Sequence, residues 1–287
     1  MNQSSVTRPP LLVQIARSIR HAPCLRAFDP LWNSVRPTYQ QLLRQLAGQR
    51  GLPIDIEGIG KVYVPASFLS GDLDRLELPM LKRFFQAIMP DTCLYDIGAS
   101  IGLHSLVAGK QMTQEAEIHA FEPDLPSCKR YLANTELLQQ KFPVHLLRCF
   151  VSDVSTTSEP RTLSPVQLIE NSPELAAQAS QHLYLFAQPQ DEQIPQIRLD
   201  DYVRAGARPP TVIKCDIEGA ELVFLKGSVE TLQQYRPILF ISLHPDLICN
   251  FNSTPEDFYS FLHSQGYEWE ILNEIGETHV YAQPVTS

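Results

Sequence analysis

The stretch YDIGASIG, residues 95–102, runs from a strand-like segment straight into a turn of small residues, and an apolar helical segment follows it. Glycines in such a turn let the backbone approach a ligand closely, and the start of the helix presents unpaired N–H groups. Gly98 and Gly102 do not have the G-x-G-x-x-G spacing of dinucleotide-binding proteins. Asp96, at the end of the strand, suits a ligand with a cationic amine better than a pyrophosphate. The stretch therefore predicts a ligand site at the carboxyl end of a strand in an α/β sheet.

Apolar segments with the length of strands alternate with helical patterns beyond residue 90. This alternation is typical of βαβ units, and it predicts an α/β fold with a mostly parallel sheet. Strands are expected at residues 92–97, 117–121, 144–151, 211–216, 237–243, 267–272 and 279–282. Helices are expected at residues 78–88, 103–111, 125–138, 220–225 and 255–264.

The first 50 residues differ from the rest of the chain in charge. They hold seven arginines against Asp29, whereas the whole chain has a formal net charge of −9. We expect a helical N-terminal extension at 1–50 and one α/β domain at 51–287, beginning with a hairpin over 54–64. A stretch at 155–196 rich in Ser, Pro, Gln and Glu is expected to be an insertion over the carboxyl edge of the sheet. The basic extension is either a solvated helix face or a contact for a phosphate, an acidic partner or an anionic membrane surface.

The composition excludes several classes of protein. With 44% hydrophobic and 19% charged residues, the 287-residue chain has the balance of a globular protein and is too apolar to be disordered. No stretch approaches the ~18 uncharged apolar residues of a spanning helix, and we expect no signal peptide. The six cysteines form no C-x-x-C pair, which argues against structural zinc and favours a reducing compartment. We therefore expect a soluble, cytoplasmic protein that binds no nucleic acid, because its body is acidic.

Two further acids follow the second and third expected strands. Glu122 lies 24 residues after Gly98, at a position where a carboxylate can accept hydrogen bonds from both hydroxyls of a ribose. Asp153 either accepts from an adenine amino group or serves as a helix cap or turn residue. The combination of the glycine turn with Glu122 favours nucleoside binding over a purely structural turn.

The segment VIKCDIEGAE, residues 212–221, delivers three carboxylates to the same edge. Ligands of open α/β sheets bind outside the carboxyl ends of the strands, so Asp216 and Glu218 should face the same crevice as Gly98 and Glu122. Glu221 falls in the first turn of the following helix, where it is expected to cap the helix and to interact with its dipole.

These motifs together resemble the FkbM-type S-adenosylmethionine-dependent methyltransferases. The resemblance implies a Rossmann-like class I methyltransferase fold, with seven mostly parallel strands and an antiparallel last strand. It also implies S-adenosyl-L-methionine as cofactor and O-methylation of a hydroxyl on a sugar or small molecule. The matching motifs occur in the family's order and lie at residues 96–102, 121–123, 199–202, 213–221 and 226–227.

The family's cofactor residues can be carried over to this chain position by position. The resemblance implies that the methionine moiety is held at the turn by Asp96, Gly98 and Gly102, the ribose by Glu122 and the adenine by Asp153. Ser100 belongs to the same turn and stands where the family commonly has Asn. Asp216 is expected at the same edge, within reach of cofactor and acceptor.

Methyl transfer to an alcohol requires that its proton be removed or shared. His244 follows the strand expected at 237–243, and imidazole titrates near neutral pH, so His244 is the first candidate for the general base. Asp216 or Glu218 would orient it or replace it, while the structural alternative is a histidine that caps the strand. The same three residues could hold Mg²⁺, but no spacing rule demands a metal, and we expect none.

Two other functions remain open at this stage. The chain could be a non-catalytic protein that binds a nucleotide or S-adenosylmethionine and recruits a partner through its basic extension. NAD-dependent oxidoreduction is disfavoured by the missing G-x-G-x-x-G pattern. The acceptor and the oligomeric state do not follow from the sequence.

Overall fold

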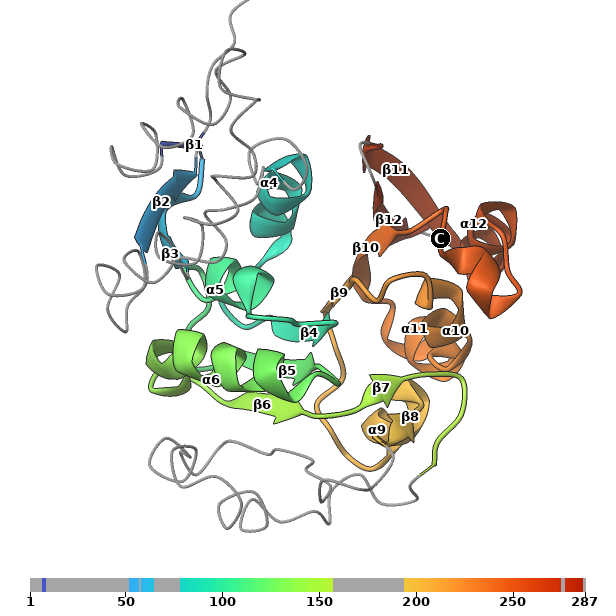
Figure 1. The fold of residues 1–287 in the computed structure, drawn as a ribbon, viewed down its shortest axis with the longest axis horizontal. Helices are drawn as coiled ribbons and strands as arrows, with labels where there is room; N and C mark the ends of the chain where they lie inside the picture. The colour runs from blue at the N-terminus through green and yellow to red at the C-terminus, as the bar shows by residue number, and fades with distance from the viewer. Residues whose placement is uncertain are drawn as a thin grey trace, which may run out of the picture. The chain divides into compact units, whose positions relative to one another are not determined.

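The computed structural model in Figure 1 describes residues 7–8, 52–56, 58–64, 78–156, 194–274 and 277–285. These residues belong to two compact units that divide between Leu78 and Pro79. Most of the expected extension at 1–50 and of the expected insertion at 155–196 lies outside the described residues. Their nature and their boundaries stay predictions.

The first unit contains a small antiparallel sheet of β1 (Thr7–Arg8), β2 (Leu52–Ile56) and β3 (Gly60–Val64). β2 and β3 form the hairpin expected from the sequence, with Leu52 paired to Val64 and Ile56 paired to Gly60. The turn between them includes Gly58, whose φ of 83° lies in the left-handed region that glycine enters without steric cost.

The second unit is built on a seven-stranded sheet with the order β11-β12-β10-β9-β4-β5-β6. All neighbouring strands pair in parallel except around β12, which is antiparallel to both β10 and β11. This confirms the expected Rossmann-like sheet with an antiparallel last strand. The strands are β4 (Cys93–Ile97), β5 (Glu117–Phe121), β6 (Val144–Leu147), β9 (Val212–Cys215), β10 (Ile238–Leu243), β11 (Tyr267–Asn273) and β12 (Thr278–Pro284).

Helices cover both faces of this sheet. On one face, Phe84 packs edge-on against Phe240 of β10 with ring centroids 5.3 Å apart, and Ser105 donates a hydrogen bond to Asp96 of β4. The helices of this face are α4 (Leu78–Ala87), α5 (Leu103–Ala108) and α6 (Leu125–Gln139). The helices of the other face are α9 (Leu199–Arg204), α10 (Glu221–Lys226), α11 (Val229–Tyr235) and α12 (Pro255–Ser264).

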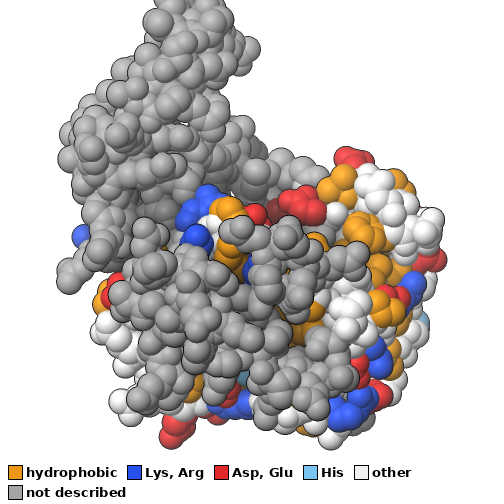
Figure 2. All heavy atoms as spheres, turned by 60° about the horizontal axis from the view of Figure 1, so that its bottom comes forward, with side chains coloured by type: hydrophobic (Ala, Val, Ile, Leu, Met, Phe, Trp, Pro, Cys, Tyr) orange, Lys and Arg blue, Asp and Glu red, His pale blue; other side chains and the backbone are white. Residues whose placement is uncertain are grey.

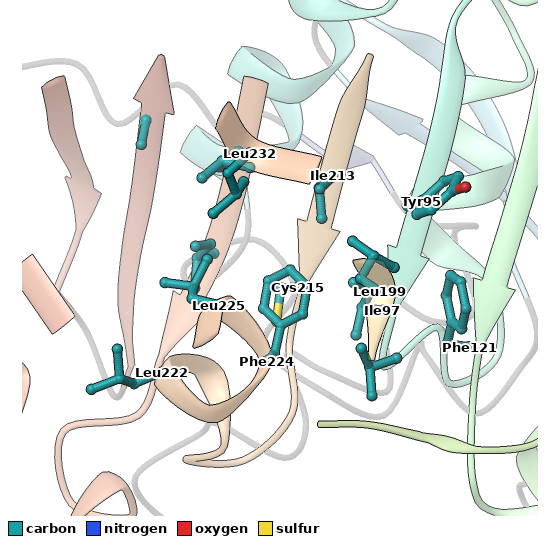
Figure 3. Close-up of a cluster of buried hydrophobic side chains, with 14 of the residues drawn as sticks. Tyr95, Ile97, Phe121, Leu199, Ile213, Cys215, Leu222, Phe224, Leu225 and Leu232 are labelled. Atoms are coloured by element: carbon teal, nitrogen blue, oxygen red, sulfur yellow. The ribbon is translucent and has the colours of Figure 1, made fainter. Parts of the chain in front are cut away.

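The main core lies between the sheet and this second set of helices. Figure 3 shows Ile213 and Cys215 of β9 pointing toward side chains of the helices, among them Leu225 and Leu232. All five residues of β4 are buried, as expected for a central parallel strand covered on both faces. Burial on both faces explains why these strands appear in the sequence as continuous apolar segments.

One expected strand is divided in the structure. The segment at 144–151 was expected to be continuous, but β6 ends at Leu147, and β7 (Phe150–Val151) pairs in parallel with β8 (Gln196–Ile197) in a separate sheet. Among the described strands β6 lies at the edge, and none of them pairs with its outer side to hold the chain in the main sheet. The backbone N–H of Phe150 and Ser152 instead donate to the carbonyls of Pro195 and Ile197.

Asp200, in the motif at 199–202, has a structural task. Its side chain is buried and accepts hydrogen bonds from the backbone N–H and the hydroxyl of Thr231, both at 2.8 Å, and from the backbone N–H of Glu230 at 3.2 Å. These groups belong to the first turn of α11, which has no helical partners for its N–H groups. Asp200 therefore joins α9 to α11.

We expect Asp200→Ala to lower the free energy of unfolding by about 2–4 kcal/mol, because it leaves buried donors without an acceptor. Asp201→Ala is the matched control. The Asp201 side chain is 28% exposed and pairs with Arg198 and Arg204, so its loss should cost less than about 1 kcal/mol. Urea denaturation followed by circular dichroism measures both; equal losses would contradict the assignment.

Candidate active site

The turn that follows β4 passes very close to the segment that follows β9. A Cβ added to Gly98, whose φ is 73°, would lie 1.8 Å from the carbonyl oxygen of Asp216. The backbone N–H of Asp216 in turn donates to the carbonyl of Ile97. Strand order reverses between β4 and β9, which is where open α/β sheets bind their ligands. Glycine is required at position 98 by both space and backbone conformation.

Glu122, which follows the neighbouring strand β5, is hydrogen-bonded to this turn. Its two carboxylate oxygens accept the backbone N–H groups of Ser100 and Asp124, each at 2.8 Å. Burial raises the pKa of the Glu122 carboxyl, against the effect of these two hydrogen bonds. Each oxygen can still accept a second hydrogen bond. Ser100 itself has a φ of 48°, a left-handed conformation that Asn adopts more readily than Ser.

Asp96 and Gly102 support the turn from the side of α5 and α6. The Ser105 hydroxyl donates to Asp96 at 2.6 Å and lies 2.8 Å from the Tyr131 hydroxyl. Burial raises the pKa of the Asp96 carboxyl, against the hydrogen bond from Ser105. A Cβ at Gly102 would lie 3.1 Å from the Tyr131 ring. The expected contacts of Asp96 and Gly102 with a methionine moiety stay predictions.

A cavity of about 600 Å³ opens at this edge of the sheet. Five of the expected site residues are among those that line it: Gly98, Ser100, Glu122, Asp216 and Glu218. Apolar side chains make up much of the remaining wall, including Ile97, Phe121, Phe150, Val151, Ile217 and Phe251. A mainly apolar pocket with a few polar groups is the usual form of a cofactor site.

The expected adenine contact is placed differently from the others. Asp153 is exposed and does not belong to the described lining of the cavity, whereas its neighbour Ser152 does. Asp153 accepts a hydrogen bond from the Ser152 hydroxyl at 3.3 Å. A role of Asp153 toward adenine therefore stays a prediction, and Ser152 is the polar side chain available in that wall.

His244 lies beside the cavity within a ring of carboxylates. Its Nδ1 is 2.9 Å from Glu221 Oε1, and its Nε2 is 3.0 Å from Glu277 Oε2. Nε2 also lies 3.7 Å from Asp216 Oδ1 and 3.6 Å from Glu218 Oε2. The structure thus brings together the three expected catalytic residues and adds Glu221 and Glu277 to them.

These carboxylates decide the protonation of the imidazole. Burial lowers the pKa of His244, but hydrogen bonds to Glu221 and Glu277 outweigh it and raise the pKa to about 10. The same contacts, with His279, hold the pKa of Glu277 well below its usual range although burial acts to raise it. In this arrangement His244 is an imidazolium at neutral pH, and an imidazolium cannot accept a proton.

Glu277 was absent from the sequence interpretation, although a signal for it existed. It directly precedes β12, and an antiparallel strand begins at the edge where its parallel neighbours end. The pairing of Leu243 with Thr278 accordingly places Glu277 beside His244. Glu221 was expected to cap its helix; it does accept the backbone N–H of Gly219 at 2.9 Å, and it also holds His244.

The turn that carries Glu218 is conformationally restricted. Glu218 has a φ of 53°, and Gly219 has a φ of 101°. A Cβ at Gly219 would lie 2.7 Å from the backbone of Leu247. Non-glycine residues in the left-handed region cost free energy and concentrate at functional sites. Ser100 and Glu218 both have this conformation, and both line the cavity.

Figure 2 shows one face, on which basic and acidic side chains are interspersed. Within the described residues, none of the helices has the length and apolarity needed to cross a membrane. The expected absence of a nucleic-acid partner stays a prediction.

Comparison with known proteins gives both curated and structural relatives. The chain is 26% identical over 171 residues to the hexuronic acid methyltransferase AglP of Haloferax volcanii, a match that covers 59% of this chain and 63% of that protein. The crystal structure of methyltransferase FkbM from Methylobacillus flagellatus KT matches with a TM-score of 0.42 and 21% identity, over 68% of this chain and 44% of that one.

An O-methyltransferase from Bacillus cereus in complex with SAH matches with a TM-score of 0.42 and 11% identity, over 71% of this chain and 80% of that one. The family model of the methyltransferase FkbM domain matches residues 96–269, from the glycine turn to β11. This match spans more than half of the chain, which therefore belongs to the FkbM methyltransferase family.

Proposed function

We propose that this chain is an S-adenosylmethionine-dependent O-methyltransferase that acts on a hydroxyl of a sugar or other small molecule. The observation that carries the proposal is the cavity at the strand-order reversal, because Glu122 lies in its wall together with Asp216 and Glu218. The similarity to a hexuronic acid methyltransferase supports a sugar as acceptor.

The residues of the cavity fit a nucleoside with a charged tail. Glu122 is held by two backbone N–H groups and keeps acceptor capacity for the two hydroxyls of a ribose. Phe121 and Val151 offer apolar surface for a purine, with Ser152 as a polar neighbour. The turn at 98–102 would receive the methionine end, and we place Asp96, Gly98, Ser100 and Gly102 in that role.

S-adenosylmethionine, when bound, supplies a methyl group on a sulfonium centre. The acceptor oxygen gains this methyl group as the sulfur–carbon bond breaks, and the sulfur keeps the electron pair. The hydroxyl proton has to be removed or shared as well, and the carboxylates of Asp216 and Glu218 line the cavity where it can be accepted. His244 would take the proton only in its neutral form, so we assign it first to orienting these carboxylates.

The cofactor assignment is tested by calorimetry with S-adenosylmethionine. We expect the wild type to bind and Glu122→Gln to bind about 10–100-fold more weakly, since a charged acceptor of ribose hydroxyls is lost. Glu136→Gln, on the exposed side of α6, is the control and should bind as the wild type does. Absence of binding to the wild type, or no effect of Glu122→Gln, would refute the assignment.

The reaction is tested with labelled cofactor and a panel of neutral hexosides and hexuronic acids. We expect a methyl ether, identified by NMR, and a fall in kcat of about 10²–10⁴-fold for Asp216→Asn, because a carboxylate of the reaction site is removed. Glu218→Gln tests whether the carboxylate of Glu218 accepts the hydroxyl proton. Cofactor binding without transfer to any hydroxyl would instead favour the non-catalytic binding protein.

A further inference from the structure

Several acidic side chains gather around His244. Four carboxylates lie within 4.0 Å of the imidazole ring nitrogens: those of Asp216, Glu218, Glu221 and Glu277. Lys214 Nζ lies 3.4 Å from Asp216 Oδ2, and His279 Nε2 lies 2.8 Å from Glu277 Oε1. Glu221 is fully buried, and its Oε2 has no hydrogen-bond partner among the described residues. A buried carboxylate is costly unless cations and hydrogen-bond donors accompany it.

The side chains that face one another in this cluster are of the types that bind metal ions in proteins. Asp216, His244 and Glu277 each offer one ligand atom, and these atoms all lie within 4.8 Å of one another. His244 Nε2 is 3.7 Å from Asp216 Oδ1 and 3.0 Å from Glu277 Oε2. Metal–ligand bonds of about 2.0–2.2 Å require ligand atoms about 3 Å apart, so small side-chain movements suffice.

Each of the three side chains also contacts a second, buried side chain. Glu221 accepts from His244 Nδ1 at 2.9 Å, which directs Nε2 toward the carboxylates. His279 lies 2.8 Å from Glu277 Oε1, and Lys214 lies 3.4 Å from Asp216 Oδ2. Outer partners of this kind, above all a carboxylate on the far nitrogen of a histidine, orient the ligands of metal ions in proteins.

We infer that Asp216, His244 and Glu277 form a binding site for one divalent transition-metal ion. The donor set of two carboxylates and one imidazole suits Mn²⁺, Fe²⁺ or Zn²⁺ better than Mg²⁺, which prefers oxygen ligands alone. The ion takes the place of the Nε2 proton of His244. Glu277 thus replaces Glu218, whose side chain is 77% exposed, in the ligand set that the sequence suggested.

The role of this ion in catalysis rests on the proposed function. Asp216 belongs both to the ion's ligands and to the wall of the cavity, so the ion borders the space in which the acceptor would lie. A metal-bound alcohol has a lowered pKa, and its proton can pass to Glu218 before the oxygen is methylated. A fixed cation would also offset the repulsion between these carboxylates and an anionic acceptor.

The site is tested on the purified full chain after removal of metal with EDTA and dialysis. Mn²⁺ is titrated in, and free Mn²⁺ is followed by electron paramagnetic resonance. We expect one Mn²⁺ per chain and at least about tenfold weaker binding by Glu277→Gln. Glu274→Gln, which changes an exposed acid of the same hairpin, is the matched control and should bind like the wild type.

Failure to bind Mn²⁺, or equal binding by Glu277→Gln and the wild type, overturns the inference. Thermal unfolding and S-adenosylmethionine calorimetry check that Glu277→Gln is folded. The variant should still bind S-adenosylmethionine, because Glu277 does not belong to the described lining of the cavity. Cofactor binding without Mn²⁺ binding refutes the metal site alone. Mn²⁺ binding without cofactor binding refutes the proposed function alone.

Discussion

The close passage of two turns at the centre of the sheet determines where every group of the site lies. β4 and β9 are paired in register up to Ile97 and Cys215, so both chains leave the sheet at the same level. They can do so only because Gly98 has no side chain to meet the carbonyl of Asp216. Glu122 then fastens the first turn through Ser100, and the second turn carries Asp216 and Glu218. One steric constraint thereby aligns the expected cofactor residues with the expected catalytic ones.

Most of the sheet could be predicted from the sequence because its central strands are buried on both faces. Apolar segments between helical patterns identified all seven strands of the main sheet, and the family resemblance supplied the antiparallel direction of the last one. The division at Leu147 could not be predicted, because Cys149, Phe150 and Val151 are as apolar as the strand before them. What ends β6 is its position at the edge, together with the partner that β8 offers. Both are properties of the folded chain.

The site was predictable where its residues follow a strand and not where several elements converge. Glu122, Asp216 and His244 each come directly after a parallel strand, and such positions share one edge. Glu277 comes before an antiparallel strand, which the same rule does not cover. The protonation of His244 depends on Glu221 and Glu277, which are 23 residues before it and 33 after it. Sequence distance conceals such a convergence, and the register of β10 with β12 brings Glu277 beside His244.

The pairing of β7 with β8 joins two points of the chain that are far apart in sequence. Phe150 lies opposite Gln196 and Val151 opposite Ile197, and both Phe150 and Gln196 belong to the wall of the cavity. The two ends of the intervening segment are thus held together independently of its length. Because the entropy of closing a loop grows only slowly with length, the pairing of β7 with β8 depends little on the number of residues between them. Changes of length between β7 and β8 would therefore leave this wall of the cavity in place.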